Sequence, residues 1–218
     1  MSDADLPDVT EHYFTGGPAT DAERRTVSVR IAGRDVDVEV APGVFSPGRI
    51  DPGTRVLLHE APTPPPSGDL LDLGCGWGPI ALTLATEAPG ATVWAVDVSE
   101  RALDLTRRNA ARLGLANVRA ASPGPGGVPD DVTFAAIWSN PPIRVGKQVL
   151  HGMLRTWLAR LAPTSSDADG AWLVVQKNLG ADSLARWITE ELAGPLGVRV
   201  VRAASDKGYR VLRVTRDR

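Results

Sequence analysis

Residues 69–79 read DLLDLGCGWGP, and this stretch decides the fold. An apolar run typical of a buried strand comes first, and three glycines follow at positions 74, 76 and 78. Pro79 comes next, and proline is favoured in the first turn of a helix. Glycines at such a junction permit a tight turn and let a ligand approach the backbone closely. The stretch therefore predicts a strand, a binding loop and a helix in direct succession.

From residue 69 onward, apolar runs typical of strands alternate with amphipathic segments typical of helices. The predicted strands are 69–74, 92–98, 117–121, 132–139, 171–177, 198–203 and 209–215. The predicted helices begin at Pro79 and after a Ser99 cap, and then cover 147–161 and 181–193. No helix separates the last two strands, so they should pair antiparallel. The expected fold is a Rossmann-like α/β domain: a mostly parallel seven-stranded sheet with helices on both faces and an antiparallel C-terminal strand.

The segment before this domain has a different pattern. Residues 26–40 alternate apolar and polar side chains around Ala-Gly-Arg, which predicts a β-hairpin. Asp51 followed by Pro52 predicts the start of a short helix. We divide the chain into a disordered tail (1–10), an N-terminal hairpin unit with a short helix (11–60), a Pro-rich linker (61–68) and a main domain (69–218).

Composition narrows the class of protein. Of the 218 residues 43% are hydrophobic, enough for a sizeable core, and the formal net charge of −2 is untypical of a strongly basic nucleic-acid-binding module. The single cysteine, Cys75, excludes a disulfide framework. We found neither an 18-residue apolar run nor a secretory signal, so we expect a cytoplasmic protein without a membrane partner. The three histidines are scattered, so no metal site is expected.

Two aspartates flank the glycine loop and suggest its ligand. Asp72 precedes the first glycine, and Asp97 ends the next predicted strand, where it can accept hydrogen bonds from ribose hydroxyls. The G-x-G-x-x-G fingerprint of nicotinamide dinucleotides is not kept, since the third glycine comes one place early. A carboxylate near the loop would also repel a pyrophosphate. S-adenosylmethionine, with an ammonium, a sulfonium and a ribose, suits this arrangement better.

The sequence Ser-Asn-Pro-Pro (139–142) stands at the end of the fourth predicted strand, which should lie next to the first. It resembles the Asn/Asp-Pro-Pro signature of amino-group methyltransferases. An exocyclic amino nitrogen is a poor nucleophile because its lone pair is delocalised. The Asn140 side-chain oxygen and the Pro141 carbonyl could each accept one of its N–H groups and aim the lone pair at a methyl donor.

Further segments extend the resemblance over about residues 11–216. In order they are HYF (12–14), GVFSPGRIDPGT (43–54), DLGCGWGPI (72–80), SNPPIRVGK (139–147), VVQKNLGADSL (174–184) and KGYRVLRV (207–214). The chain thus looks like a class I S-adenosylmethionine-dependent methyltransferase of the small-methyltransferase-domain family. That family includes ribosomal RNA guanine-N2 methyltransferases of the RsmC type, whose larger members duplicate the domain. This chain has one copy, as in a compact single-domain branch.

The resemblance implies S-adenosylmethionine as cofactor and RNA, in the form of ribosomal RNA or the small ribosomal subunit, as partner. The implied catalytic residues are Asn140, Pro141 and Pro142. The implied cofactor-binding residues are Asp72, Gly74, Cys75, Gly76, Gly78, Asp97, Val98, Ser122 and Asn140. The expected substrate-binding residues are Phe45, Ile143, Arg144 and Lys147.

Two positions depart from the family pattern. Ile143 stands where many amino methyltransferases carry an aromatic that stacks on the base. Phe45 or Tyr13 could supply that aromatic face instead. Ser122 stands where many class I enzymes carry Asp or Asn for the adenine amino group, so adenine contact there should be weaker or made by the backbone.

Several basic residues are candidates for contact with RNA. Arg144, Lys147, Lys177, Lys207 and Arg210 fall near predicted strand ends, and we expect some of them to meet RNA phosphates.

Three alternative functions stay open: a protein glutamine N-methyltransferase, a noncatalytic RNA-binding or ribosome assembly factor, and an NAD-binding dehydrogenase. Also open are the nucleotide, the choice between naked RNA and assembled subunit, and the oligomeric state.

Overall fold

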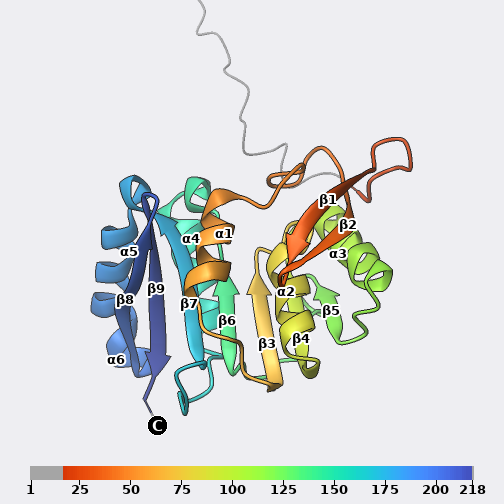
Figure 1. Ribbon diagram of the computed structural model, residues 1–218. Coiled ribbons are helices and arrows are strands. Elements are labelled where there is room, and N and C mark those ends of the chain that lie inside the picture. The colour runs from red at the N-terminus through yellow and green to blue at the C-terminus, as the bar shows by residue number, and fades with distance from the viewer. Residues whose placement is uncertain (1–16, 218) are drawn as a thin grey trace, which may run out of the picture.

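The computed structural model describes residues 17–217. The predicted tail (1–10), the HYF segment (12–14) and the aromatic face proposed for Tyr13 lie outside these residues. Within them the chain forms one large sheet, a two-stranded N-terminal sheet, and helices on both faces of the large sheet (Figure 1).

The large sheet has seven strands in the order β5-β4-β3-β6-β7-β9-β8. Their bounds are β3 Ser67–Leu73, β4 Gly90–Val96, β5 Val118–Ala121, β6 Ala136–Ser139, β7 Gly170–Gln176, β8 Val198–Asp206 and β9 Tyr209–Arg216. The first five of these are parallel, and β9 pairs antiparallel with both β7 and β8. The expected fold class is confirmed, and β6 does lie beside β3.

Helices cover both faces of this sheet. The α-helices are α1 Pro52–Glu60, α2 Pro79–Glu87, α3 Glu100–Arg112, α4 Lys147–Leu158, α5 Ala181–Trp187 and α6 Ala193–Leu196. Short 3-10 helices cover Ile143–Val145 and Lys177–Leu179, and a π-helical turn covers Ile188–Leu192. Buried side chains of α1, α2 and α3 join one core cluster, and those of α4 and α5 join another. The sheet is therefore buried from two sides, as parallel sheets require.

The N-terminal hairpin packs on the helical layer. Strands β1 (Arg25–Ile31) and β2 (Arg34–Val40) pair antiparallel, as predicted. Their inward valines form a third cluster with Leu82 of α2 and Leu105 of α3. Helix α1 packs on β7 and β9. The proposed boundary at 61–68 stays a prediction, and the residues before it share their core with those after it.

Two details differ from the sequence-based expectation. Strand β6 is confined to Ala136–Ser139 instead of 132–139, because Phe134 makes an isolated bridge to Leu161 outside the ladder. In α4 the buried face is formed by Leu150, Leu154, Trp157 and Leu158. The helix predicted over 147–161 ends at Leu158, and Val149, which a four-residue spacing counted back from Trp157 would place on the buried face, is 60% exposed. An α-helix has 3.6 residues per turn, so a four-residue repeat drifts off the buried face.

Candidate active site

A pocket opens at the carboxyl ends of β3 and β6, where ligands of such sheets bind. It holds about 340 Å³ of space, part of it open to solvent. Its lining residues come from three separate parts of the chain: Phe45, Ser46, Asp51, Thr54, Gly74, Cys75, Gly76, Trp77, Pro79, Ile80 and Asn140. Among these described lining residues there is one carboxylate and neither lysine nor arginine. Such a lining suits a cationic ligand and would leave a pyrophosphate without a counter-charge.

The three loop glycines have different roles. All have positive φ angles: 80° at Gly74, 57° at Gly76 and 98° at Gly78. A Cβ at Gly74 or Gly76 would meet no atom within 4 Å, so open space lies over these two residues. A Cβ at Gly78 would come within 3.0 Å of the Thr106 hydroxyl oxygen on α3. The first two glycines therefore leave room beside the backbone, and the third lets α2 pack closely against α3.

Asp97 lies just after β4 and is tied to the glycine loop. Its Oδ2 accepts from the Gly76 amide at 3.0 Å, and its Oδ1 accepts from the Ser99 amide at 2.9 Å. Burial raises the pKa of this carboxyl. Val98 follows and is 56% exposed, which is unusual for a valine at the end of a buried strand. Together they offer a hydrogen-bonding carboxylate and an apolar surface beside the loop.

Asp72 lies beneath the loop and does not line the pocket. It is fully buried, and its Oδ2 accepts from the Ala81 amide in the first turn of α2 at 2.9 Å. Its Oδ1 has no hydrogen-bond partner. Burial raises the pKa of this carboxyl to about 8. A buried acid with an unpartnered oxygen favours either a proton or a cationic group nearby.

Ser139 and the two prolines fix the turn at the end of β6. The Ser139 hydroxyl is fully buried and donates to the carbonyl oxygen of Leu73 at 2.6 Å, which joins the ends of β6 and β3. Pro142 has φ −74° and ψ 77°, and the Ile143 amide donates to the Pro141 carbonyl at 2.8 Å. This is an inverse γ-turn. The Pro141 carbonyl keeps a second lone pair.

The Asn140 side chain faces the pocket and is held by α1. Its Nδ2 donates to Asp51 Oδ2 at 2.9 Å and to Thr54 Oγ1 at 3.1 Å. Asp51 is also the N-cap of α1, as predicted, because the same Oδ2 accepts from the amides of Gly53 and Thr54. From the sequence, Asp51 was predicted only as a helix cap. Its contact with Asn140 spans 89 residues and had no local signal.

The other side of the pocket mouth is an ordered loop that carries Phe45. The Phe45 side chain is 54% exposed and lines the pocket. Ser46 has a positive φ of 51°, which is costly for a residue with a side chain. Its carbonyl accepts from Trp77 Nε1 at 3.2 Å, so the loop is tied to the glycine loop. Trp77, whose role the sequence left undefined, is 1% exposed.

The structure brings together some of the expected residues. Those lining the pocket are Phe45, Gly74, Cys75, Gly76 and Asn140. Ten other expected residues are not part of the pocket lining: Asp72, Gly78, Asp97, Val98, Ser122, Pro141, Pro142, Ile143, Arg144 and Lys147. Arg144 and Lys147 are exposed just beyond the Asn-Pro-Pro turn.

Cys75 and Arg210 are engaged within the protein. The Cys75 thiol is buried 3.6 Å from the Thr106 hydroxyl, and burial raises its pKa well above the usual value. It is therefore unsuited to act as a thiolate nucleophile. Arg210, expected near RNA phosphates, forms an ion pair with Asp182, and its side chain is 12% exposed.

The described residues, 17–217, also bear on metal binding and on membrane spanning. They contain no group of three or more His, Cys, Asp or Glu side chains that could hold a metal ion. In the same residues no helix is both long and apolar enough to cross a membrane.

Known proteins are similar to this chain in sequence. An uncharacterized protein, YbxB, of Bacillus subtilis is 34% identical over 206 residues, which cover 94% of this chain and 98% of that protein. Ribosomal RNA small subunit methyltransferase C of Aeromonas hydrophila is 37% identical over 143 residues, 65% of this chain and 40% of that protein. The chain thus spans less than half the length of this second relative.

A solved structure and a family match add to this. The T. thermophilus 16S rRNA N2 G1207 methyltransferase (RsmC), in complex with AdoMet and guanosine, superposes with a TM-score of 0.68 at 25% identity. The superposition covers 92% of this chain and 52% of that one. The sequence matches the methyltransferase small domain over residues 35–213, a range that includes the hairpin strand β2, the glycine loop and the Asn-Pro-Pro turn. With most of its length inside that match, the chain belongs to the methyltransferase small domain family.

Proposed function

We propose that this protein transfers a methyl group to an exocyclic amino nitrogen, and that its substrate is guanine N2 in ribosomal RNA. One observation carries the proposal: Asn140 stands at the pocket beside the glycine loop with both amide hydrogens already donated, so that its free group is an acceptor. A hydrogen-bond acceptor can hold one N–H of an amino group and orient its lone pair. When the N–C bond forms and the S–C bond of the donor breaks, the surplus proton of the amine leaves to water. The RsmC-type relatives, whose names state rRNA as substrate, support the choice of RNA.

The donor is S-adenosylmethionine, which supplies an electrophilic methyl group on a positively charged sulfur. Residues that line the pocket or lie beside it fit this cofactor. Gly74 and Gly76 leave open space for a ligand against the backbone. Asp97 can accept from ribose hydroxyls, and the exposed Val98 can cover an apolar ring. A bound cationic group nearby would favour the ionised form of the buried Asp72 carboxyl, whose Oδ1 has no partner among the described residues.

Asn140 and Pro141 position the nucleophile. The Asn140 Oδ1 and the second lone pair of the Pro141 carbonyl can each accept one N–H of the substrate amine. Two fixed acceptors hold the nitrogen and direct its lone pair toward the cofactor side of the pocket, which lowers the barrier through orientation and electrostatics. The inverse γ-turn and the Ser139 hydrogen bond keep both acceptors in place before substrate arrives. The chain's own residues form no covalent bond with substrate in this scheme.

Phe45 provides the aromatic face that Ile143 does not. It lies at the same pocket as Asn140, and a large exposed aromatic on an ordered loop is suited to stack on a flipped base. Stacking of this kind contributes roughly 1–3 kcal/mol per base.

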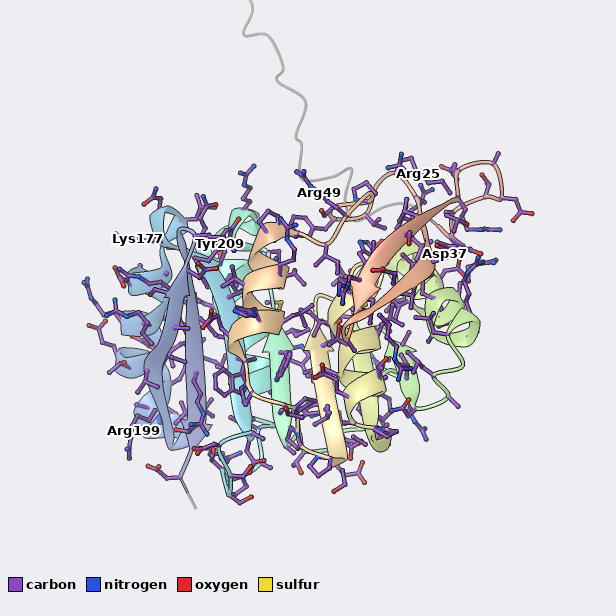
Figure 2. All side chains as sticks on the ribbon, viewed as in Figure 1. Arg25, Asp37, Arg49, Lys177, Arg199 and Tyr209 are labelled. Atoms are coloured by element: carbon purple, nitrogen blue, oxygen red, sulfur yellow. The ribbon has the colours of Figure 1, made fainter. Side chains whose placement is uncertain are left out.

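Exposed basic residues surround the pocket edge and suit RNA phosphates. Arg144 and Lys147 follow the Asn-Pro-Pro turn, and Lys177 follows β7. Figure 2 shows Arg49, Arg25 and Lys177 at the edge where β3, β6 and β7 end, and Arg199 at the opposite edge. Arg49, Arg25 and Lys177 thus lie toward the end of the sheet at which the pocket opens, where they would contact phosphates of a bound RNA. A ribosomal substrate also implies a cytoplasmic location.

The test is methyl transfer to RNA. We would incubate the protein with methyl-tritiated S-adenosylmethionine and either undermethylated small ribosomal subunits or naked ribosomal RNA, and separate the labelled nucleosides. The expected product is N2-methylguanosine, formed at a strongly reduced rate in Asn140→Ala. Asn178→Ala is the matched control, since Asn178 is exposed on the 3-10 helix after β7. Absence of label in any RNA would overturn the RNA proposal.

Two of the three rival functions give different results in the same assay. A protein glutamine N-methyltransferase would label a protein fraction and leave RNA unlabelled. A noncatalytic RNA-binding or assembly factor would label nothing, although it could still bind RNA. Binding of S-adenosylmethionine, measured by thermal shift, then separates a retained cofactor site from a lost one.

A further inference from the structure

We propose that Asp51 and Thr54 are positioning residues that lock the Asn140 amide in one orientation, so that helix α1 belongs to the catalytic machinery. The kinetic part of this inference rests on the proposed amino-group methylation. The lock itself is a property of the protein without substrate, and it can be tested without any methyl transfer.

The lock follows from the chemistry of the two partners. An Asn side chain presents two amide hydrogens on one side and an oxygen on the other, and the two ends have nearly the same shape. Asp51 approaches one end of Asn140 at 2.9 Å, and an ionised carboxylate can only accept. The end that faces Asp51 must therefore be Nδ2. Thr54 Oγ1 accepts the second amide hydrogen at 3.1 Å, so both hydrogens are taken.

The consequence is that Oδ1 is turned toward the pocket. No described residue donates a hydrogen bond to this oxygen. If the amide were rotated by half a turn, its NH₂ group would meet the substrate amine, and two donors would repel each other. The lock thus excludes the unproductive orientation before substrate binds, so no reorganisation is needed during the reaction.

The lock is itself held firmly. Asp51 Oδ2 also accepts from the Gly53 amide at 2.7 Å and from the Thr54 amide at 3.2 Å, so the N-terminus of the nine-residue α1 fixes the carboxylate. Thr54 is 3% exposed. A Cβ at Gly53 would lie 2.9 Å from the Tyr209 ring, so β9 also bounds this turn; Tyr209 is seen near α1 at the start of β9 in Figure 2.

Side-chain NMR tests the lock directly. The chain has four asparagines, at 109, 117, 140 and 178, so selective ¹⁵N-asparagine labelling gives four side-chain amide pairs, and Asn140→Ala identifies the pair of Asn140. Asp51→Ser keeps an N-capping hydroxyl but is too short to reach Asn140. Thr54→Val keeps the shape of the buried side chain without its acceptor. Each variant should shift the Asn140 pair and speed its hydrogen exchange, while the Asn117 pair, which caps the end of α2, stays unchanged. Unchanged Asn140 resonances in both variants would overturn the lock.

Kinetics then test its role. Asp51→Ser should lower kcat roughly 10-fold to 100-fold with little change in the Kd of S-adenosylmethionine, because the reacting nitrogen is misplaced. Asp51→Asn should restore most of the activity, since its amide oxygen can keep both the cap and the contact. In an Asn140→Ala background Asp51→Ser should cost almost nothing more. Multiplicative losses would show that Asp51 acts independently of Asn140 and would overturn the positioning role. If the protein methylates no RNA, the NMR result still decides the lock.

Discussion

The two walls of the pocket differ in where their atoms come from. One wall, which we call the loop wall, is the glycine loop 74–79, a continuous stretch that shapes the site mainly through its backbone. The other, the side-chain wall, consists of Phe45, Asp51 and Thr54, of which Asp51 and Thr54 contact Asn140 across 86 or more residues of sequence. The loop wall suits a cofactor that must be held closely, and the side-chain wall suits a nucleophile that must be aimed. Damage to each wall should therefore have a different kinetic signature.

The largest effect is expected from closing the open space on the loop wall. Gly76→Ala places a methyl group where no protein atom lies within 4 Å, at a φ of 57°. We expect the affinity for S-adenosylmethionine, measured by calorimetry, to fall roughly 10-fold to 100-fold, because each 1.4 kcal/mol of lost contact is a factor of ten.

Gly114→Ala is the matched control for this change. Gly114 has a similar φ of 69° and equally open surroundings, but it lies after α3, away from the pocket. Both variants should lose about 1–2 kcal/mol of stability from backbone strain. If both bound the cofactor equally well, the loop wall would not be the cofactor site.

The next effect concerns the side-chain wall. Phe45→Ala should lower kcat/KM for RNA roughly 5-fold to 150-fold, the range given by 1–3 kcal/mol of base stacking. The affinity for S-adenosylmethionine should stay the same, and so should stability, because Phe45 is largely exposed. Phe45→Trp should retain activity.

Val201→Ala serves as the comparison for Phe45. Val201 is 49% exposed on β8, a strand that contributes nothing to the pocket lining. Its removal should leave kcat/KM for RNA unchanged. An equal loss of cofactor affinity and of kcat/KM in Phe45→Ala would contradict the division of roles between the walls.

The difference between the walls also explains what could be predicted from the sequence. The loop wall is local: strand, three glycines and a proline stand side by side, so the fold class and the places of Gly74, Gly76 and Asp97 followed from the pattern. The position of Asn140 at a strand end beside the loop was predicted for the same reason, because its turn is formed by four consecutive residues, 139–142. Asp51 was identified as a helix cap, since capping is also a local property.

The rest required three-dimensional information. Nothing near Asp51 or Thr54 in the sequence indicates a contact with Asn140, because that contact forms only when α1 packs on β7 and β9. Likewise Asp72 was expected to face the cofactor, and its pairing with the Ala81 amide depends on how α2 sits above β3. The ion pair that withdraws Arg210 from the surface is a tertiary contact of the same kind.

A smaller effect, on pH dependence, tests the buried acid beneath the loop wall. The pKa of Asp72 is about 8 in the folded protein and close to the ordinary aspartate value of 3.8 when unfolded. Between these values the folded state binds one proton more than the unfolded state, so stability falls as pH rises from about 4 to about 8. The raised pKa of Asp97 acts in the same direction. Asp72→Asn should flatten the fall in Tm between pH 5 and pH 8 without removing it. A parallel pH profile for wild type and Asp72→Asn would contradict this explanation.

The smallest effect is expected where the two walls are joined. Trp77→Phe removes the hydrogen bond from Nε1 to the Ser46 carbonyl and also shrinks a buried ring. Trp138→Phe makes the same change in size at an equally buried tryptophan whose Nε1 has no partner. The free energy of unfolding should therefore fall by about 1 kcal/mol more in Trp77→Phe than in Trp138→Phe.

Because Ser46 adjoins Phe45, Trp77→Phe should also lower kcat/KM for RNA a few-fold more than it lowers cofactor affinity. If the loss fell on cofactor affinity alone, Trp77 would serve the loop wall only, and the two walls would act independently.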